Sequence, residues 1–219
     1  MQKAEIAIYT SLVMFLVFQI STAFGLPPVF HLAPLLAISF FSLFSAYLQW
    51  RLWLVVSWGW TYLVSWLVEY LGVNSGLVFG FYEYGGMLGP KIFGVPLIIP
   101  HLWFVVVYIS YITAGSRLGA ALLAGLWDLA YEPLFVKIGL WSWEGGVVPL
   151  TNFFGWLATA AMISAIFKPT RATAVERQSY LVLLLAYLPS ALKYGMFWSL
   201  LVAAIALVTA LVLRHYGYK

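Results

Sequence analysis

The sequence has 219 residues, of which 64% are hydrophobic and only 8% are charged. Soluble globular domains carry about 25% charged residues, so this composition excludes a soluble enzyme and predicts an integral membrane protein. The formal net charge of +4 comes from basic residues scattered between apolar segments, a pattern that sets membrane orientation and does not indicate nucleic-acid binding. No polar run of domain size interrupts the chain, so we expect residues 1–219 to form one membrane domain.

Eight apolar stretches approach the length of about 20 residues that a membrane-spanning helix needs. They lie at residues 5–24, 29–49, 52–71, 92–114, 118–138, 150–167, 178–194 and 196–213. The last two share one apolar run that is broken only around "LPSALKYG", so seven spans is an alternative. The predicted fold class is therefore an all-α, polytopic transmembrane helical bundle.

The basic residues favour eight spans and indicate an orientation. With eight spans, the Lys and Arg residues divide eight against three between the two sides, and the richer side of a membrane protein is normally cytoplasmic. Seven spans would leave Lys193 within the membrane and weaken this asymmetry. The first apolar stretch lacks a small-residue cleavage site, so we expect a retained helix and two cytoplasmic termini.

Two similar stretches, "GFYEYGG" from Gly80 and "GLWSWEGG" from Gly139, follow the third and fifth predicted helices. Each begins eleven residues after an acid, Glu69 in the first case and Asp128 in the second. With eight spans, both stretches lie on the non-cytoplasmic side.

The similarity continues downstream, where each stretch is followed by a valine-proline pair. Trp103 and Trp156 each lie seven residues after that proline. The pattern predicts a parallel internal repeat with units at about 52–114 and 118–167, and substrate sites tend to lie between such halves. The alternative is chance, because Gly, Pro and Trp are common in and around membrane helices.

Three acids lie within the predicted helices, where a charged side chain costs ~2.5–3.5 kcal/mol even on the lenient insertion scale. Asp128 is near the middle of its helix, and Glu132 lies one turn later on the same face. We interpret these two residues and Glu69 as functional groups. The alternative is a structural hydrogen bond or ion pair with a residue such as His101 or Arg117.

Other residues near the acids have both structural and functional interpretations. Pro133 has no N–H to donate to the carbonyl of Leu129, which frees a polar backbone group beside the acids. His101 is either a hydrogen-bonded core residue or a catalytic group. Asn152 starts a helix, where capping alone would explain it. Gly72, which recurs with two further glycines at spacings of four, predicts a ridge for the close approach of another helix.

The sequence lacks the parts of several familiar mechanisms. It has no cysteine, no HExxH, no G-x-S-x-G, no glycine-rich phosphate loop and no D-D-x-x-D. Metal-free acid–base chemistry or transport remains. Two adjacent carboxyl groups tend to share one proton, and protonation of a trisubstituted double bond gives a tertiary carbocation, which aromatic faces stabilise by ~0.5–2 kcal/mol each.

Four motifs also carry a family resemblance. They are E-x2-G-x3-G-x3-G-x-Y-x-Y (69–84), D-x3-E-P (128–133), W-x-W (141–143) and N-F-x-G-W (152–156). In order and spacing the sequence resembles the carotenoid biosynthesis family of membrane proteins that contains γ-carotene and bisanhydrobacterioruberin hydratases. The resemblance implies addition of water to a terminal double bond of an acyclic carotenoid, without cofactor or metal. It also implies a membrane-dissolved substrate and other carotenoid enzymes as partners.

Two departures from the family pattern concern the second unit. Glu132 stands where the family has a second Asp, and the second aromatic loop is shorter. These departures leave the substrate more open than the reaction class.

The resulting hypothesis makes Asp128, helped by Glu132, the proton donor. Glu69 then orients water or takes the proton back. The residues expected to line the substrate path are Tyr82, Tyr84, Trp103, Trp127, Tyr131, Trp141, Trp143 and Trp156, with His101 and Asn152. Two alternatives stay open: a carotenoid end-group cyclase with a dry pocket, and a proton-coupled transporter of a hydrophobic solute.

Overall fold

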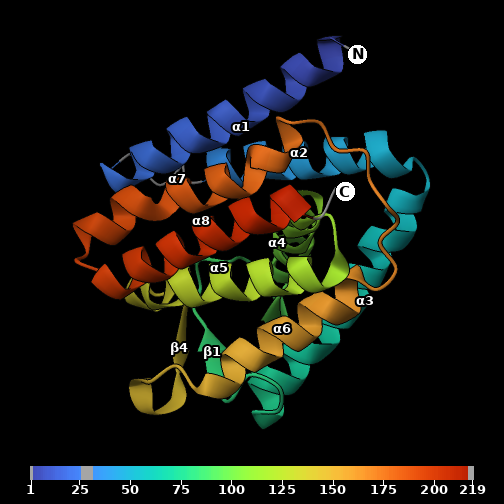
Figure 1. Ribbon diagram of the computed structural model, residues 1–219. Helices are drawn as coiled ribbons and strands as arrows, with labels where there is room; N and C mark the ends of the chain where they lie inside the picture. The colour runs from blue at the N-terminus through green and yellow to red at the C-terminus, as the bar shows by residue number, and fades with distance from the viewer. Residues whose placement is uncertain (1, 26–31, 217–219) are drawn as a thin grey trace.

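The computed structural model describes residues 2–25 and 32–216, which form eight α-helices, two short strand pairs and two 3₁₀ turns (Figure 1). The helices are α1 (Gln2–Ala23), α2 (Leu32–Trp50), α3 (Trp53–Ser75), α4 (Ile99–Ala114), α5 (Arg117–Lys137), α6 (Leu150–Ser164), α7 (Ser179–Lys193) and α8 (Phe197–Tyr216). The strands are β1 (Tyr82–Tyr84), β2 (Lys91–Ile92), β3 (Val95–Pro96) and β4 (Trp141–Trp143), and the 3₁₀ turns are η2 (Glu144–Gly146) and η3 (Glu176–Gln178). The predicted helical fold class is confirmed.

The fourth helix begins later than the sequence pattern indicates. We expected a helix from residue 92, but β2 and β3 form an antiparallel hairpin and α4 starts at Ile99. Gly94 turns the hairpin with a φ of 85°, and a residue before proline, here Val95, is driven to extended geometry. Local turn chemistry therefore overrides the apolar composition of this segment.

The predicted break between the last two helices is present. Gly195 adopts a φ of 67° between the end of α7 and the start of α8, a left-handed conformation that ends a helix. Three helical segments, Ala33–Trp50, Arg117–Lys137 and Phe197–His215, are long and apolar enough to cross a membrane by length and composition. These helices are consistent with a membrane protein, and the number of spans remains a prediction.

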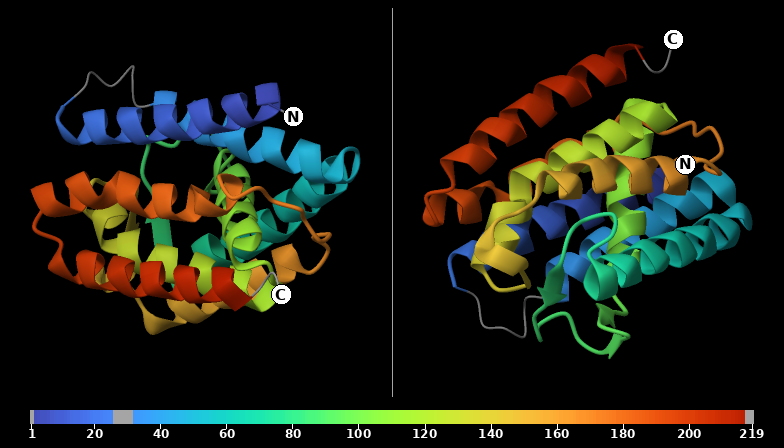
Figure 2. Two further views of the ribbon diagram at one scale, coloured as in Figure 1. Left: turned by 45° about the horizontal axis from the view of Figure 1, so that its top comes forward. Right: turned by 90° about the horizontal axis from the view of Figure 1, so that it is seen from below.

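Helix α4 lies at the centre of the bundle. In Figure 1 it is seen nearly along its axis, with α5 and α3 against it, and nearly all of its residues are buried. Helices α1, α7, α8 and α5 follow one another as packed neighbours (Figure 2). Large apolar side chains such as Leu118 and Phe197, which are 82% and 78% exposed, cover the outside, as expected of a surface in contact with lipid.

The two similar stretches of the sequence meet as a short antiparallel ladder. β1 pairs with β4, with Tyr82 opposite Trp143 and Tyr84 opposite Trp141. Alternate side chains of a strand point to opposite faces, so the aromatic residues share the inner face. Glu83 and Ser142, which pair at the centre of the ladder, are exposed.

Candidate functional site

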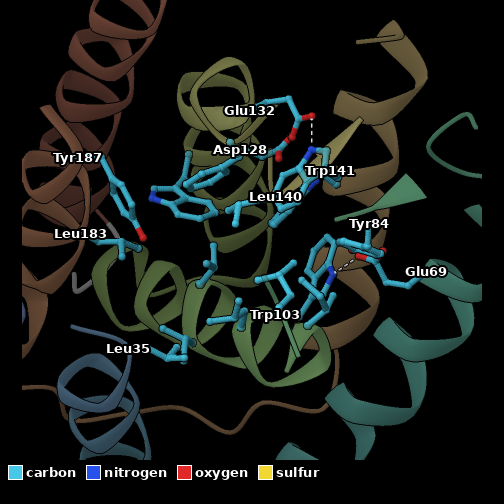
Figure 3. Close-up of a pocket in the computed structure, with 18 of the residues that line it drawn as sticks. Leu35, Glu69, Tyr84, Trp103, Asp128, Glu132, Leu140, Trp141, Leu183 and Tyr187 are labelled. Carbon is cyan, nitrogen blue, oxygen red and sulfur yellow. Dashed lines mark hydrogen bonds between the residues drawn. The ribbon is translucent and has the colours of Figure 1, made fainter. Parts of the chain in front are cut away.

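A cavity of about 220 Å³ lies between the β1–β4 ladder and the surrounding helices (Figure 3). Its lining includes Glu69, Asp128 and Glu132, three acids that are each at most 4% exposed. In Figure 3, Asp128, Glu132 and Trp141 lie on one side, Glu69 and Tyr84 on another, and Leu183 and Tyr187 across from them. The rest of the wall is almost entirely apolar or aromatic.

The first half-site is the group around Glu69. Its carboxylate accepts hydrogen bonds from the hydroxyls of Tyr82 and Tyr84, the latter at 2.6 Å, and from Nε1 of Trp103 at 2.7 Å. Burial, followed by the charge of Glu69, raises the pKa of both tyrosines, so they remain protonated donors. Three donors around one carboxylate favour its charged form.

Gly72 explains how Tyr82 reaches Glu69. A Cβ atom at Gly72 would lie 2.8 Å from Cε1 of Tyr82, which is closer than side chains normally approach. The glycine ridge was expected to receive another helix, and this expectation is wrong. Instead Gly72 admits the ring of Tyr82, and Gly76 and Gly80 admit Phe81 and Pro149, because the loop folds back over the end of α3.

The second half-site is the group around Asp128 and Glu132. Oε1 of Glu132 accepts hydrogen bonds from Nε1 of Trp141 at 2.7 Å and Nε1 of Trp143 at 2.5 Å. Oδ2 of Asp128 accepts one from Nδ2 of Asn152 at 2.8 Å. The two carboxyl groups lie one turn apart on α5, close enough to interact with each other, and two adjacent carboxyl groups tend to share one proton.

The donors around this pair indicate where its proton resides. Glu132 receives two N–H groups and Asp128 receives one, and hydrogen bonds to a carboxylate favour its charged form. Glu132 is therefore the better anion and Asp128 the better acid. Glu69 lies close enough to interact electrostatically with both, so the cavity brings together a pair of adjacent acids and a third, separate acid.

Aromatic rings join the two half-sites. Trp103 of the first half-site stacks on Trp156 with a centroid separation of 3.8 Å. Trp127, one residue before Asp128, has the rings of Phe135, Trp156 and Tyr187 within 6.1 Å of its centroid. These faces surround the cavity with the electron-rich surface that attracts cations.

Trp127 has an unusual buried donor. The residue is 8% exposed, and among residues 2–25 and 32–216 its Nε1 has no hydrogen-bond acceptor. Leaving a buried donor unpaired costs ~1–3 kcal/mol. The other unpaired buried side-chain atoms of the described residues are Ser and Thr hydroxyls that do not line this cavity.

A second cavity of about 250 Å³ lies on the other side of Glu132 and Asn152, beside the α5–α6 connection. Both residues line both cavities. Leu129, whose carbonyl cannot receive a hydrogen bond from Pro133, lines the second one too. Glu132 and Asn152 are therefore shared between the large apolar cavity and this second cavity.

The amino-acid sequence matches a known protein family. A model of the family described as "Carotenoid biosynthesis protein" matches residues 26–216. The chain belongs to this family.

One relative is the bisanhydrobacterioruberin hydratase of Haloarcula japonica, which is 31% identical to this chain over 121 residues. The match covers 48% of this chain and 41% of the relative, so it spans about two-fifths of that protein's length. No solved structure matches the chain.

In this carotenoid biosynthesis protein, most of the residues selected from the sequence line the first cavity. The set comprises Glu69, Tyr82, Tyr84, Trp103, Trp127, Asp128, Glu132, Trp141, Trp143, Asn152 and Trp156. His101 and Tyr131 do not belong to the lining. Nε2 of His101 hydrogen-bonds to Ser39 and its Nδ1 accepts from Trp58, while the hydroxyl of Tyr131 donates to the carbonyl of Leu184.

The three acids do not pair with His101 or Arg117, the structural partners that the sequence suggested. Within the described part of the chain, neither His101 nor Arg117 contacts the three acids, and Arg117 donates to the carbonyl of Phe167 instead. The acids are held by aromatic N–H and O–H groups and by Asn152. These neutral donors leave the negative charge of the site uncompensated by any cationic side chain in the described residues.

Part of the cavity wall comes from helices in which the sequence analysis found no candidate site residue. Phe15 and Gln19 of α1, Leu35 of α2, and Leu183 and Tyr187 of α7 line the cavity. Their helices are apolar like the rest of the chain and show no motif. Only the packing of α1, α2 and α7 against the rest of the bundle brings these residues to the site.

Proposed function

We propose that this member of the carotenoid biosynthesis family is a hydratase that adds water to a terminal double bond of an acyclic carotenoid. The observation that carries the proposal is the pair of adjacent buried acids Asp128 and Glu132 inside an aromatic cavity that a third buried acid, Glu69, also lines. The name of the archaeal relative supports the same reaction class. The family and the apolar wall support a membrane-dissolved isoprenoid as the substrate.

The first step is proton transfer to carbon. The O–H bond of Asp128 breaks and its proton adds to the less substituted carbon of the double bond, so that the π electrons form the new C–H bond. A tertiary carbocation and the Asp128 carboxylate result. Glu132 keeps its two indole donors throughout, which stabilises negative charge next to the developing cation.

The second step is capture by water. A lone pair of water forms the C–O bond, and the resulting oxonium group loses a proton to a carboxylate, either Asp128 or Glu69. The product is a tertiary alcohol. One water is consumed, and the proton returns to Asp128 either directly or through Glu69, so the cycle closes without a cofactor and without a change of oxidation state.

The rings around the cavity protect the cation between these steps. Tyr82 and Trp143, whose centroids are 4.9 Å apart, and Trp141 line the cavity beside the acids. Each suitably placed face stabilises a cation by ~0.5–2 kcal/mol. Exclusion of bulk water by the apolar wall also strengthens these interactions.

We further propose that residues 52–114 and 118–167 are two copies of one unit in a bundle of eight spans with cytoplasmic termini. The antiparallel ladder supports the repeat, because each residue of β1 pairs with a residue of β4 in a pattern symmetric about Glu83 and Ser142. The stacking of Trp103 on Trp156, which occupy matching places in the two units, supports it as well.

Pigment analysis tests the function. The full chain is expressed in cells that accumulate lycopene and, separately, in cells that accumulate bisanhydrobacterioruberin, and the carotenoids are separated and weighed by mass spectrometry. We expect products heavier by one or two water molecules. Isomers of unchanged mass would indicate a cyclase, and unchanged pigments together with proton-dependent solute uptake would indicate a transporter.

A further inference from the structure

The unpaired N–H of Trp127 has a place in the proposed reaction. Trp127 lines the cavity, is more than nine-tenths buried, and directly precedes Asp128 in α5. An indole N–H is a donor only, so it can be satisfied by an oxygen acceptor but not by another N–H. Buried donors in native structures are nearly always paired, which indicates that a bound molecule supplies the acceptor.

The chemistry of the substrate narrows the identity of this acceptor. The reacting double bond and its alkyl substituents contain no hydrogen-bond acceptor comparable to oxygen. The rings of Phe135, Trp156 and Tyr187 surround Trp127, but none of these residues, the hydroxyl of Tyr187 included, accepts a hydrogen bond from its Nε1. The acceptor that the reaction itself brings into the cavity is the oxygen of water, which becomes the hydroxyl oxygen of the product.

We infer that Nε1 of Trp127 binds the water that captures the carbocation and then holds the product hydroxyl. This inference rests on the proposed hydratase function. One lone pair of the water accepts the indole N–H, and the other forms the C–O bond with the cation. The oxonium proton then passes to the carboxylate of Asp128, which lines the same cavity and has just released its own proton to carbon.

The inference predicts a specific change in how the cation is consumed. Without the indole donor, protonation by Asp128 still proceeds, but water is held less well at the cation. The cation then loses a proton from a neighbouring carbon and returns to an alkene. Loss of the donor should therefore lower hydration more than it lowers protonation.

The experiment separates the two steps with D₂O. Membranes containing the full chain are incubated in D₂O with lycopene or, if the wild-type chain hydrates only the longer precursor, with bisanhydrobacterioruberin. A deuteronation that is followed by loss of a different hydrogen leaves deuterium in the recovered alkene, and each capture gives a hydrated product. Both are counted by mass spectrometry for the wild type, for Trp127→Phe and for Trp60→Phe.

In Trp127→Phe we expect the ratio of hydrated product to deuterated alkene to fall by about tenfold, as expected for loss of one buried hydrogen bond. Trp60→Phe is the matched control, since Trp60 is exposed and its Nε1 donates to the carbonyl of Met162 outside the cavity. That control should keep the wild-type ratio.

The other outcomes contradict the inference. An unchanged ratio in Trp127→Phe, or equal losses of deuteration and hydration, would mean that the N–H does not hold the water. If the Phe variant fails to accumulate in the membrane, Trp127 is replaced by benzothienylalanine, which keeps the bicyclic ring and has sulfur in place of the N–H. The same ratio of hydrated product to deuterated alkene is then measured. Failure of the wild-type chain to hydrate either precursor would refute the proposed function itself.

Discussion

The first half-site, around Glu69, and the second, around Asp128 and Glu132, share a spacing but differ in chemistry. Tyr82 and Tyr84 lie 13 and 15 residues after Glu69, and Trp141 and Trp143 lie 13 and 15 residues after Asp128. In the first half-site these aromatic residues donate to the acid at the matching position. In the second they donate to Glu132, one turn further along α5.

In the proposed reaction this difference gives the two halves different tasks. Glu69 stands alone with three donors, which favour its charged form and oppose the cost of its burial. In the second half, Glu132 takes the aromatic donors and leaves Asp128 with one amide donor. We propose that the additional acid converts a site that holds charge into a site that can release a proton, and the first predictions below test that contrast.

Asp128→Asn should produce the largest effect, because it removes the proton that starts the reaction. We expect the yield of hydrated carotenoid per unit of membrane protein to fall ~10²–10⁴-fold, the usual contribution of a general acid. Glu144→Gln, which changes an exposed loop acid, should leave the yield unchanged. Full hydration by a folded Asp128→Asn protein would exclude Asp128 as the acid.

Glu69→Gln should reduce the yield by a smaller factor and also destabilise the protein. A glutamine offers one acceptor oxygen and an NH₂ group to three donors, so at least one buried donor loses its partner at ~1–3 kcal/mol. Thermal unfolding in detergent should show a lower Tm than for Glu83→Gln, whose acid is exposed on the ladder. Equal melting of the two variants would contradict the hydrogen-bonding of Glu69.

Gly72→Ala should disturb the first half-site alone, because the new methyl group meets the ring of Tyr82 at 2.8 Å. Overpacking of this kind typically costs ~1–3 kcal/mol, and we expect hydration to fall with it. The control is Gly59→Ala in the same helix, where no atom lies within 4 Å of the added Cβ. A similar Tm for the two variants would show that Tyr82 is not constrained by this glycine.

Trp143→Phe and Tyr82→Phe compare the halves directly, since these residues pair across the ladder. Each removes one donor and keeps a ring, at ~1.5–3 kcal/mol for a hydrogen bond to a charged group. We expect Trp143→Phe to slow protonation of the substrate, measured as deuterium incorporation. With one donor fewer, the Glu132 carboxylate is less stable as an anion, so Glu132 would hold the proton for more of the time and Asp128 for less. Tyr82→Phe should leave this rate closer to the wild-type value, and the reverse order would contradict the division of tasks.

His101→Gln should produce the smallest effect on catalysis. His101 bonds to Ser39 and Trp58 and does not line the cavity. The ratio of hydrated product to substrate should therefore stay within about twofold of the wild type, as for changes away from a site. A large loss of hydration at unchanged protein level would return His101 to the list of catalytic candidates.

The sequence alone determined the helical class, the position of most helices, and the acids and most of the aromatic residues that line the cavity. Apolar stretches mark helices because each must satisfy its own backbone hydrogen bonds in lipid, and rare acids such as Glu69 and Asp128 stand out because burial of charge is costly. The spacing of the aromatic residues after each acid also depends only on the local chain.

The tertiary structure decided which groups meet. No local rule pairs Tyr82 with Trp143, directs Trp141 to Glu132 instead of Asp128, or turns His101 and Tyr131 away from the cavity. The wall from α1, α2 and α7 had no signal, because apolar side chains that face a cavity and those that face lipid are chemically alike. Whether a helix face lines the cavity or contacts lipid depends on what packs against it, and only the assembled bundle determines that.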